Sequence, residues 1–312
     1  MSIIENLDSL SSIPPGSAVS IGNFDGVHLG HQAIIRTLIS TGLSTTIVTF
    51  EPHPLSVLRP ELAPPRLTSE AAKLRRLKEL GVDHVVLLRP EPSVLNLSAR
   101  EFYDRIRTGL KPGVMAEGKD FYFGKSRSGT TQVLRQWCEQ DAIDLRIVQD
   151  AVVRLPGKQQ VEVSSSLVRW LLLQGRTREA NACLGSPYRI EGKVVRGNAR
   201  GRTIGFPTAN LDCGDQLIPA DGVYAASCTV TGNPHAVALS IGSAPTFGGS
   251  ARQVEAHLID FSGDLYGQTL AIDVGDWVRG QMKFCSAPQL IEQLDRDVKA
   301  ICNLDAAIKQ IV

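Results

Sequence analysis

The sequence predicts two folding units: an α/β unit with an open parallel sheet, followed by a small antiparallel β-barrel that ends in a helix. The chain has 312 residues, which is more than a single domain usually holds. Between residue 18 and about residue 150, β-prone runs alternate with helical patterns, as they do where helices join parallel strands. After residue 185, short alternating runs separated by glycine and proline are typical of a small barrel.

The first unit is predicted to contain five strands, each a short β-prone run. These runs are residues 18–21, 45–50, 83–88, 113–116 and 145–148. The apolar spacing of residues 32–39 suits a helix that packs on a sheet. Thr68 or Ser69 can cap a second helix that ends at Gly81, and Ser98 with Glu101 has the spacing of a capping box.

The second unit is predicted to contain five or six strands. Five runs can be located, at residues 190–196, 222–230, 235–241, 253–261 and 268–274. A final helix begins near Ser286, with Pro288 in its first turn. The halves are separated at Gly185-Ser186-Pro187, after a helical stretch over residues 165–184. We therefore expect domains of residues 1–184 and 185–312.

Composition limits the classes of partner. The 33 basic and 32 acidic residues nearly cancel, and the net charge of +1 provides no field suited to nucleic acid. The six cysteines are dispersed, as is typical of reduced thiols in the cytoplasm. No secretory signal and no apolar run of roughly 20 residues is present, so we expect no membrane partner. The sequence leaves the oligomeric state open.

A glycine-rich segment between the first strand and the first helix predicts a phosphate site. Phosphates bind well at the N-terminus of a helix, where free N–H groups and the helix dipole favour an anion. The side chains of His28 and His31 can donate hydrogen bonds to phosphate oxygens. Two structural histidines or two metal ligands would have the same spacing, but no Cys or carboxylate cluster accompanies them at ligand spacing. The residues predicted to bind phosphate here are Gly22, Asn23, Phe24, His28, Gly30 and His31.

A series of motifs, in this order and spacing, resembles the bifunctional bacterial riboflavin kinase/FAD synthetase family over nearly the whole chain. The matching segments are residues 20–31, 49–54, 118–124, 163–169, 197–210, 241–247, 254–258 and 264–267. The first segment is similar to that family's form of the nucleotidyltransferase His-x-x-His motif, and residues 197–210 are similar to the flavokinase signature. The resemblance implies a Rossmann-like nucleotidyltransferase domain followed by a riboflavin kinase barrel with a C-terminal helix.

For the first half, the resemblance implies that FMN is adenylylated by ATP and that pyrophosphate leaves. Alignment of the reactants and neutralisation of developing charge suffice for this chemistry. His28 and His31 would contact the phosphates, and Ser165 and Arg169 would form a second anion site. Asp120 would help to position ATP. Without the resemblance, the serines are better explained as a helix cap and Asp120 as a turn residue.

For the second half, the resemblance implies that riboflavin is phosphorylated by ATP. The oxygens of Thr208 and Asn210 suit Mg²⁺, because the ATP phosphates supply the remaining negative charge. Glu255 would act as the general base that takes a proton from the ribityl 5′-hydroxyl. Arg279 would lie near the flavin, although it has equally the character of a surface cation, and a lone Glu on a strand is usually solvent-facing. Further predicted ATP contacts are Gly197 and Arg202.

Three positions depart from the family pattern. Ala244 stands where a polar or basic residue is frequent, Glu117 replaces an apolar residue before Gly118, and Arg89-Pro90 replaces a common phenylalanine. These positions concern flavin affinity more than phosphate chemistry. Two alternatives to the bifunctional enzyme stay open, namely an active kinase with an inactive first half and a flavin sensor that no longer turns over. The substrates implied are riboflavin, FMN and ATP, with Mg²⁺ as cofactor.

Overall fold

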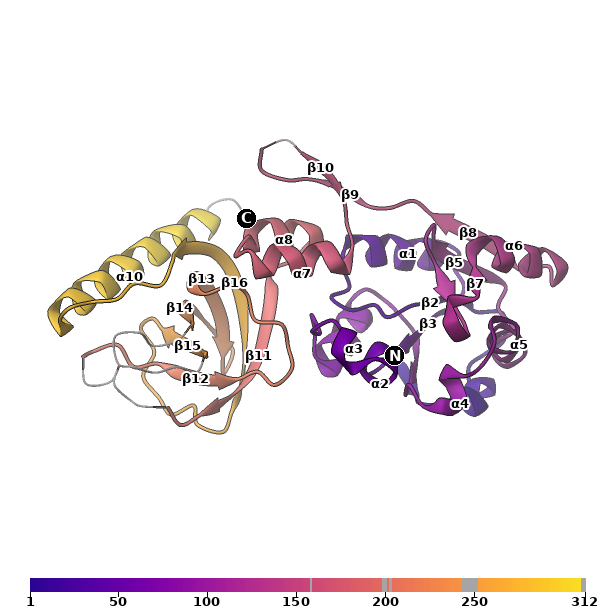
Figure 1. The fold of residues 1–312 in the computed structure, drawn as a ribbon, viewed down its shortest axis with the longest axis horizontal. Helices are drawn as coiled ribbons and strands as arrows, with labels where there is room; N and C mark the ends of the chain where they lie inside the picture. Colours follow the sequence, from indigo (N-terminus) through magenta and orange to yellow (C-terminus); the bar gives the residue numbers. More distant parts are fainter. Residues whose placement is uncertain (158, 198–200, 202–203, 243–251, 310–312) are drawn as a thin grey trace. The chain divides into compact units, whose positions relative to one another are not determined.

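The computed structural model describes residues 1–157, 159–197, 201, 204–242 and 252–309. The chain forms two compact units, Met1–Ser165 and Ser166–Val312 (Figure 1). The first is an α/β unit and the second a β-barrel with helices, which confirms the predicted fold class. A compact unit and a sequence domain need not end at the same residue, and the domain boundary at residue 184 stays a prediction.

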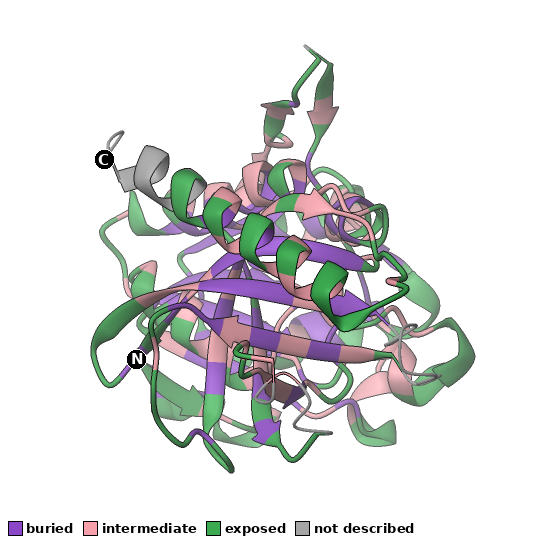
Figure 2. Ribbon diagram, turned by 90° about the vertical axis from the view of Figure 1, so that its left-hand side faces the viewer, coloured by how far each residue is buried: buried purple, intermediate pink, exposed green. Residues whose placement is uncertain are grey.

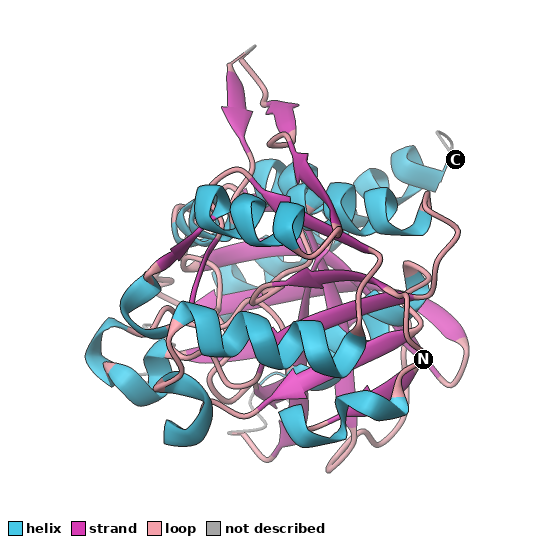
Figure 3. Cartoon of the chain, turned by 90° about the vertical axis from the view of Figure 1, so that its right-hand side faces the viewer, coloured by secondary structure: helices cyan, strands magenta, loops and turns pink. Residues whose placement is uncertain are grey.

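The first unit is built on a six-stranded parallel sheet in the order β1-β4-β3-β2-β5-β8. Figure 3 shows the strands of the chain in magenta and its helices in cyan. The strands are β1 (Ser2–Ile4), β2 (Ala18–Ile21), β3 (Thr45–Phe50), β4 (His84–Leu88), β5 (Val114–Gly118) and β8 (Asp144–Val148). Five of the six lie where they were predicted. The sixth, β1, was not predicted; it is three residues long and pairs with β4.

Helices cover both faces of this sheet and form two apolar cores. The α-helices are α1 (Leu29–Ile39), α2 (Leu55–Leu58), α3 (Glu70–Glu79), α4 (Pro92–Leu95), α5 (Ala99–Leu110) and α6 (Thr131–Gln140), and the 3₁₀ helices are η1 (Leu7–Ser12), η2 (Pro60–Leu62) and η3 (Lys125–Arg127). One core includes Ile35 and Leu77 from α1 and α3, and the other includes Tyr103 and Leu134 from α5 and α6. Ser69 caps α3, and Ser98 with Glu101 forms the predicted capping box of α5.

The chain order of the strands places a switch point at β2. β2 is followed in sequence by β3 on one side, whereas β5 lies on its other side. Ligands of open α/β sheets bind beyond the carboxyl ends of the strands at such a point. Two small antiparallel ribbons complete the unit: β6 (Tyr122–Phe123) with β7 (Gly129–Thr130), and β9 (Val152–Arg154) with β10 (Gln160–Glu162).

The second unit is a closed barrel with the strand order β11-β12-β15-β14-β13-β16. Its strands are β11 (Tyr188–Val195), β12 (Ala209–Asp212), β13 (Gly222–Val230), β14 (Asn233–Gly242), β15 (Gln253–Leu258) and β16 (Thr269–Arg279). The strands alternate between buried and more exposed residues, because one face of each strand points into the barrel (Figure 2). The sequence missed β12, since its residues follow a Pro-Thr turn signal.

Within the described residues, three helices accompany the barrel: α7 (Ser165–Leu173), α8 (Thr177–Leu184) and α10 (Ala287–Lys309). The helical stretch predicted over residues 165–184 is in fact two helices, because the chain turns at Gly175 with a φ of +71° that favours glycine. The hydroxyl of Thr177 donates to the carbonyl of Gly275, and Asn181 Nδ2 donates to that of Val274. These bonds attach α8 to strand β16.

Candidate active sites

The two histidines of the glycine-rich segment are held together at the N-terminus of α1. The helix begins at Leu29, three residues before the predicted start, so His28 is its N-cap and its Nδ1 accepts a hydrogen bond from the His31 N–H at 3.4 Å. The two rings stack with centroids 3.7 Å apart. A Cβ at Gly30 would lie 3.1 Å from the His28 ring, which explains the glycine between them. Both imidazoles are thereby placed where a helix N-terminus attracts anions.

His31 is held by ring contacts more than by hydrogen bonds. Its ring lies 4.9 Å from that of Phe24, and its buried Nδ1 has no hydrogen-bond partner among the described residues. Burial, the neighbouring His28 and the cation of Lys73 lower the pKa of His31 well below its ordinary value of 6.5. These surroundings favour the neutral imidazole, and an anion bound nearby would favour its protonation.

The predicted residues before the histidines form a tightly fixed loop base. The N–H of Gly22 donates to the carbonyl of Val48 at 2.9 Å, and the Thr49 hydroxyl donates to the carbonyl of Asn23 at 3.0 Å. Phe24 is buried with a φ of 47°, in the left-handed region that few side chains adopt. β3 thus anchors one side of the loop that carries the histidines.

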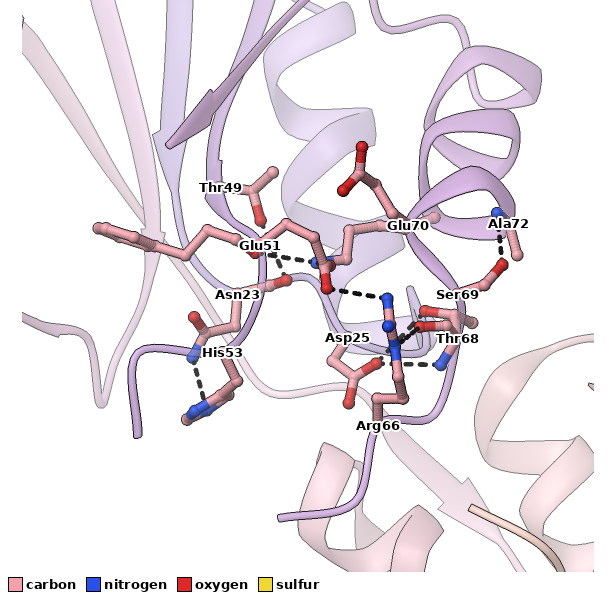
Figure 4. A network of polar contacts seen from close by, with 12 residues as sticks. Asn23, Asp25, Thr49, Glu51, His53, Arg66, Thr68, Ser69, Glu70 and Ala72 are labelled. Carbon is pink, nitrogen blue, oxygen red and sulfur yellow. Dashed lines mark hydrogen bonds and ion pairs between the residues drawn. The ribbon is translucent and has the colours of Figure 1, made fainter. Parts of the chain in front are cut away.

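Asp25, which the sequence analysis did not single out, connects this loop to a second segment. Its buried carboxylate accepts the N–H groups of Leu67 and Thr68 at 3.0 and 3.1 Å (Figure 4). The hydroxyl of Ser165 donates to the backbone carbonyl of Asp25 at 2.9 Å. The structure therefore brings Ser165, a predicted phosphate ligand, to the glycine-rich loop.

A buried ion-pair network follows β3, and the sequence analysis did not predict it. Glu51 accepts from Lys73 Nζ at 2.6 Å and from Arg66 Nη2 at 2.8 Å (Figure 4). Lys73 also donates to the carbonyl of Phe50 at 3.1 Å. Arg66 lies 15 residues and Lys73 lies 22 residues from Glu51 in the chain, so no local sequence pattern could reveal this network.

A pocket opens beside this network. It is lined by Asn23 and Asp25 from the glycine-rich loop, by Phe50, Glu51 and His53 from the end of β3, and by Arg66. Nδ2 of Asn23 lies 3.1 Å from Nε2 of His53 across the pocket wall. The lining combines the aromatic side chain of Phe50 with several charged groups.

Two further residues were predicted for the first site, Asp120 and Arg169. Asp120 is exposed in a turn after β5, where the N–H of Phe121 donates to the carbonyl of Gly118. Arg169 belongs to α7 in the second compact unit. The phosphate contacts predicted for Asp120 and Arg169 stay predictions.

In the second unit, the pairing of β12 with β15 brings two predicted residues together. Asn210 and Glu255 are direct partners in the antiparallel ladder, 45 residues apart in sequence. Directly opposed residues share one face of a sheet, with Cβ atoms roughly 5 Å apart. A Cβ on Gly197 would lie 2.2 Å from Asn210 Nδ2. The backbone at Gly197 thus lies against the amide that stands opposite the predicted base.

The loop before β12 folds back on itself near Thr208. A Cβ on Gly201 would lie 2.2 Å from the carbonyl of Phe206 and 3.5 Å from Oγ1 of Thr208. Nδ1 of His257, two residues after Glu255, lies 2.8 Å from the carbonyl of Pro207. The loop therefore lies along β15. Arg202 and Ala244 fall outside the described residues.

The electrostatics of the second site distinguish Glu255 from Arg279. Glu255 is partly buried, and this burial raises its pKa above the ordinary value of 4.5. Arg279 is held by Asp297 of α10, whose carboxylate accepts from its Nη2 at 2.7 Å and from its Nε at 3.0 Å. Burial gives Glu255 the character of a stronger base, while the guanidinium of Arg279 is already engaged within the fold.

Comparison with known proteins identifies a family for each half. Residues 10–167 match the FAD synthetase family model, and residues 184–304 match the riboflavin kinase family model. Within the part of the chain that the structure describes, no helix has the length and apolarity required to cross a membrane.

Curated relatives resemble the chain over nearly its whole length. Proteins named bifunctional riboflavin kinase/FMN adenylyltransferase are 36% identical in Escherichia coli K12, covering 95% of this chain and 96% of the relative, and 34% identical in Bacillus subtilis 168, covering 90% of each. A crystal structure described as a macrolide-efflux protein from Streptococcus pneumoniae superimposes with a TM-score of 0.85 at 31% identity, covering 97% of this chain and 99% of that one. The chain belongs to the family of bifunctional riboflavin kinase/FMN adenylyltransferases.

Proposed function

We propose that the chain makes FAD from riboflavin in two ATP-dependent steps, each in its own half. The barrel half phosphorylates riboflavin to FMN, and the α/β half transfers AMP from ATP to FMN and releases pyrophosphate. The observation that carries this proposal is that each family match contains its own set of phosphate-binding motif residues. The substrates are riboflavin, FMN and ATP.

In the α/β half, an oxygen of the FMN phosphate attacks the α-phosphorus of ATP. A bond forms between that oxygen and phosphorus, and the bond to the bridging oxygen of the leaving pyrophosphate breaks. His28 and His31, stacked at the start of α1, donate hydrogen bonds to the phosphates and stabilise the charge that builds up on the leaving group. Ser165 contributes a hydroxyl beside the same loop, and Asp120 and Arg169 assist in holding ATP.

The pocket between the glycine-rich loop and the end of β3 adjoins the residues proposed to bind phosphate. Its cavity volume of about 20 Å³ suits a water-sized group, so we do not place the flavin ring in it.

In the barrel half, Glu255 accepts the proton of the ribityl 5′-hydroxyl as that oxygen attacks the γ-phosphorus of ATP. ADP then leaves as the bond between the γ-phosphorus and the bridging oxygen breaks. A carboxyl group with a raised pKa is well matched to this role, because general bases work best when their pKa lies near the operating pH. Asn210 faces Glu255 across the ladder, so the base and the phosphate-binding loop share one face.

The oxygens near this loop fit a magnesium ion. Thr208 and Asn210 supply neutral oxygen donors, and Gly197 and Gly201 leave no side chain on the backbone beside them. Mg²⁺ bound with ATP would neutralise charge on the phosphates. Gly197 and Arg202 complete the proposed ATP contacts. The flavin contact of Arg279 stays a prediction, and we propose that its ion pair with Asp297 orders the end of β16 before riboflavin binds.

A cytoplasmic location is part of this proposal and is supported by six free, dispersed cysteines. The two alternatives, a kinase with an inactive first half and a flavin sensor, are less well supported. The first half retains His28, His31 and Ser165 in one cluster, and the second retains Asn210 opposite Glu255. A sensor would not require a general base.

The test is the flavin product profile of the full chain. The purified protein is incubated with riboflavin, ATP and Mg²⁺, and the flavins are separated by chromatography. FMN followed by FAD supports the proposal, FMN alone indicates a kinase, and unchanged riboflavin indicates a sensor.

Two variants assign the steps to the halves. A chain with both His28→Ala and His31→Ala should accumulate FMN without FAD, whereas Glu255→Gln should block phosphorylation and still convert supplied FMN to FAD. FAD formation at the parental rate in the double variant would refute the proposed first site. Loss of both activities in either variant would indicate a shared site or misfolding, which a circular dichroism spectrum separates.

A further inference from the structure

Two neighbouring strands of the α/β unit, β2 and β5, separate at the proposed phosphate site. The last ladder pair between β2 and β5 is Val19 with Met115. Each strand nevertheless continues to pair with its other neighbour, β2 with β3 through Ile21 and β5 with β8 through Gly118. A gap in backbone hydrogen bonding therefore opens between β2 and β5 at their carboxyl ends.

The side chain of Glu117 fills this gap. Continued from the last pair, the register would place Ile21 opposite Glu117. The side chain takes over the missing bond, because Glu117 Oε1 accepts the Ile21 N–H at 2.8 Å. Oε2 lies 3.3 Å from the hydroxyl of Ser20, which donates to it. Glu117 is 1% exposed, so this carboxyl group is part of the sheet interior.

The surroundings of Glu117 favour the neutral acid. Among the described residues, no ion pair reaches its carboxyl group, and burial raises its pKa well above the ordinary value. The Cys138 thiol on α6 is the titratable group that interacts with the Glu117 carboxyl group. The neutral hydroxyl of Ser20 on β2 also faces this carboxyl group. A carboxylate here would be a buried charge without a cation, which is costly.

We propose that Glu117 is a positioning residue for adenylyl transfer, whose side chain ties the base of the His28 loop to the base of the Asp120 turn. Ile21 directly precedes the loop, and Gly118 after Glu117 opens the turn. The N–H of Gly22 is already held by β3, so Glu117 fixes the side of the loop base that β3 leaves unsupported. This inference rests on the proposed function of the first half.

Three variants of the full chain test it, with FAD formation from supplied FMN and ATP as the assay. Glu117→Val removes the acceptor and leaves the Ile21 N–H unpaired, so we expect kcat/KM for FAD formation to fall about tenfold or more. Glu117→Gln keeps a neutral acceptor of the same shape, so it should stay within about threefold of the parent. Glu139→Gln removes an exposed carboxylate on α6 and is the matched control. Riboflavin phosphorylation should stay at the parental rate in all three.

The pH profile separates positioning from a general loss of stability. As the pH rises, ionisation of Glu117 would place an uncompensated charge beneath the loop, so kcat/KM of the parent for FAD formation should decline and Glu117→Gln should lack that decline. Coincident profiles, or parental FAD formation by Glu117→Val, would overturn the inference while leaving the proposed function intact. A parent chain that makes no FAD from FMN would overturn both.

Discussion

The ion pair between Lys73 and Glu51 allows a quantitative test of how the first site is held in place. The two side chains are 4% and 8% exposed, and Nζ lies 2.6 Å from Oε2. Removing one partner of a buried pair typically costs about 3–5 kcal/mol, because the other charge is left uncompensated. Arg66 still reaches Glu51 at 2.8 Å, so the cost of Lys73→Met should be smaller, about 2–3 kcal/mol.

The converse variant removes the anion and leaves the cation. Glu51→Gln leaves the buried Lys73 with the carbonyl of Phe50 as an acceptor, so we expect about 3 kcal/mol of destabilisation. The double variant removes both buried charges, and its cost should fall short of the sum of the single costs by about 2 kcal/mol.

The assay must report on the first unit alone, because a two-unit chain need not unfold in one step. Trp137 lies on α6 in that unit, whereas Trp170 and Trp277 lie in the second and are each 50% exposed. With the last two replaced by Phe, the fluorescence of Trp137 during urea unfolding follows the α/β unit. Additive costs in the double-mutant cycle, with coupling below about 0.5 kcal/mol, would refute the reasoning.

Three further predictions concern residues of the two sites. Because the pKa of His31 is lowered in the folded protein, the unfolded chain takes up a proton first as the pH falls below about 6.5. The free energy of unfolding should therefore decrease on acidification below that pH, and His31→Gln should reduce this pH dependence in urea titrations. Asp25→Ala should destabilise the first unit by about 2–3 kcal/mol, since two backbone N–H groups lose a charged acceptor, and Asp25→Asn should cost less in the same fluorescence assay. Gly197→Ala would place a Cβ 2.2 Å from Asn210 Nδ2, so riboflavin phosphorylation should fall about tenfold or more while FAD formation from FMN persists; an unchanged kinase rate would contradict the close approach.

Strands with a clear β-prone run and helices with a clear capping residue could be predicted from the sequence, because short stretches of residues determine them. The strands over residues 18–21, 45–50 and 222–230 were predicted with the bounds that the structure has. The N-cap of α3 is Ser69, one of the two candidates, Thr68 and Ser69, that the sequence offered. The strand β12 was missed, because it is defined by pairing with β11 and β15 rather than by its own residues.

The sequence predicted those site residues that lie within one short motif, but not the contacts between distant segments. The histidine pair is local, and its stacking at the start of α1 follows from a spacing of three residues. The network around Glu51 joins segments far apart in the chain, and Asp25 gave no signal beyond its place in a motif. Glu117 was visible as a departure from the family pattern, but the bond that it makes to Ile21 depends on where two strands separate.

Because Asn210 and Glu255 are paired across the ladder, the proposed kinase chemistry depends on the register of strands β12 and β15. A slip of one residue between β12 and β15 would turn one of the two side chains to the other side of the barrel wall. A closed barrel resists such a slip, because each strand is paired on both edges. Insertions in those connecting loops of this half that carry no proposed site residue should therefore be tolerated far better than a single deletion within either strand, even where the deleted residue touches no substrate.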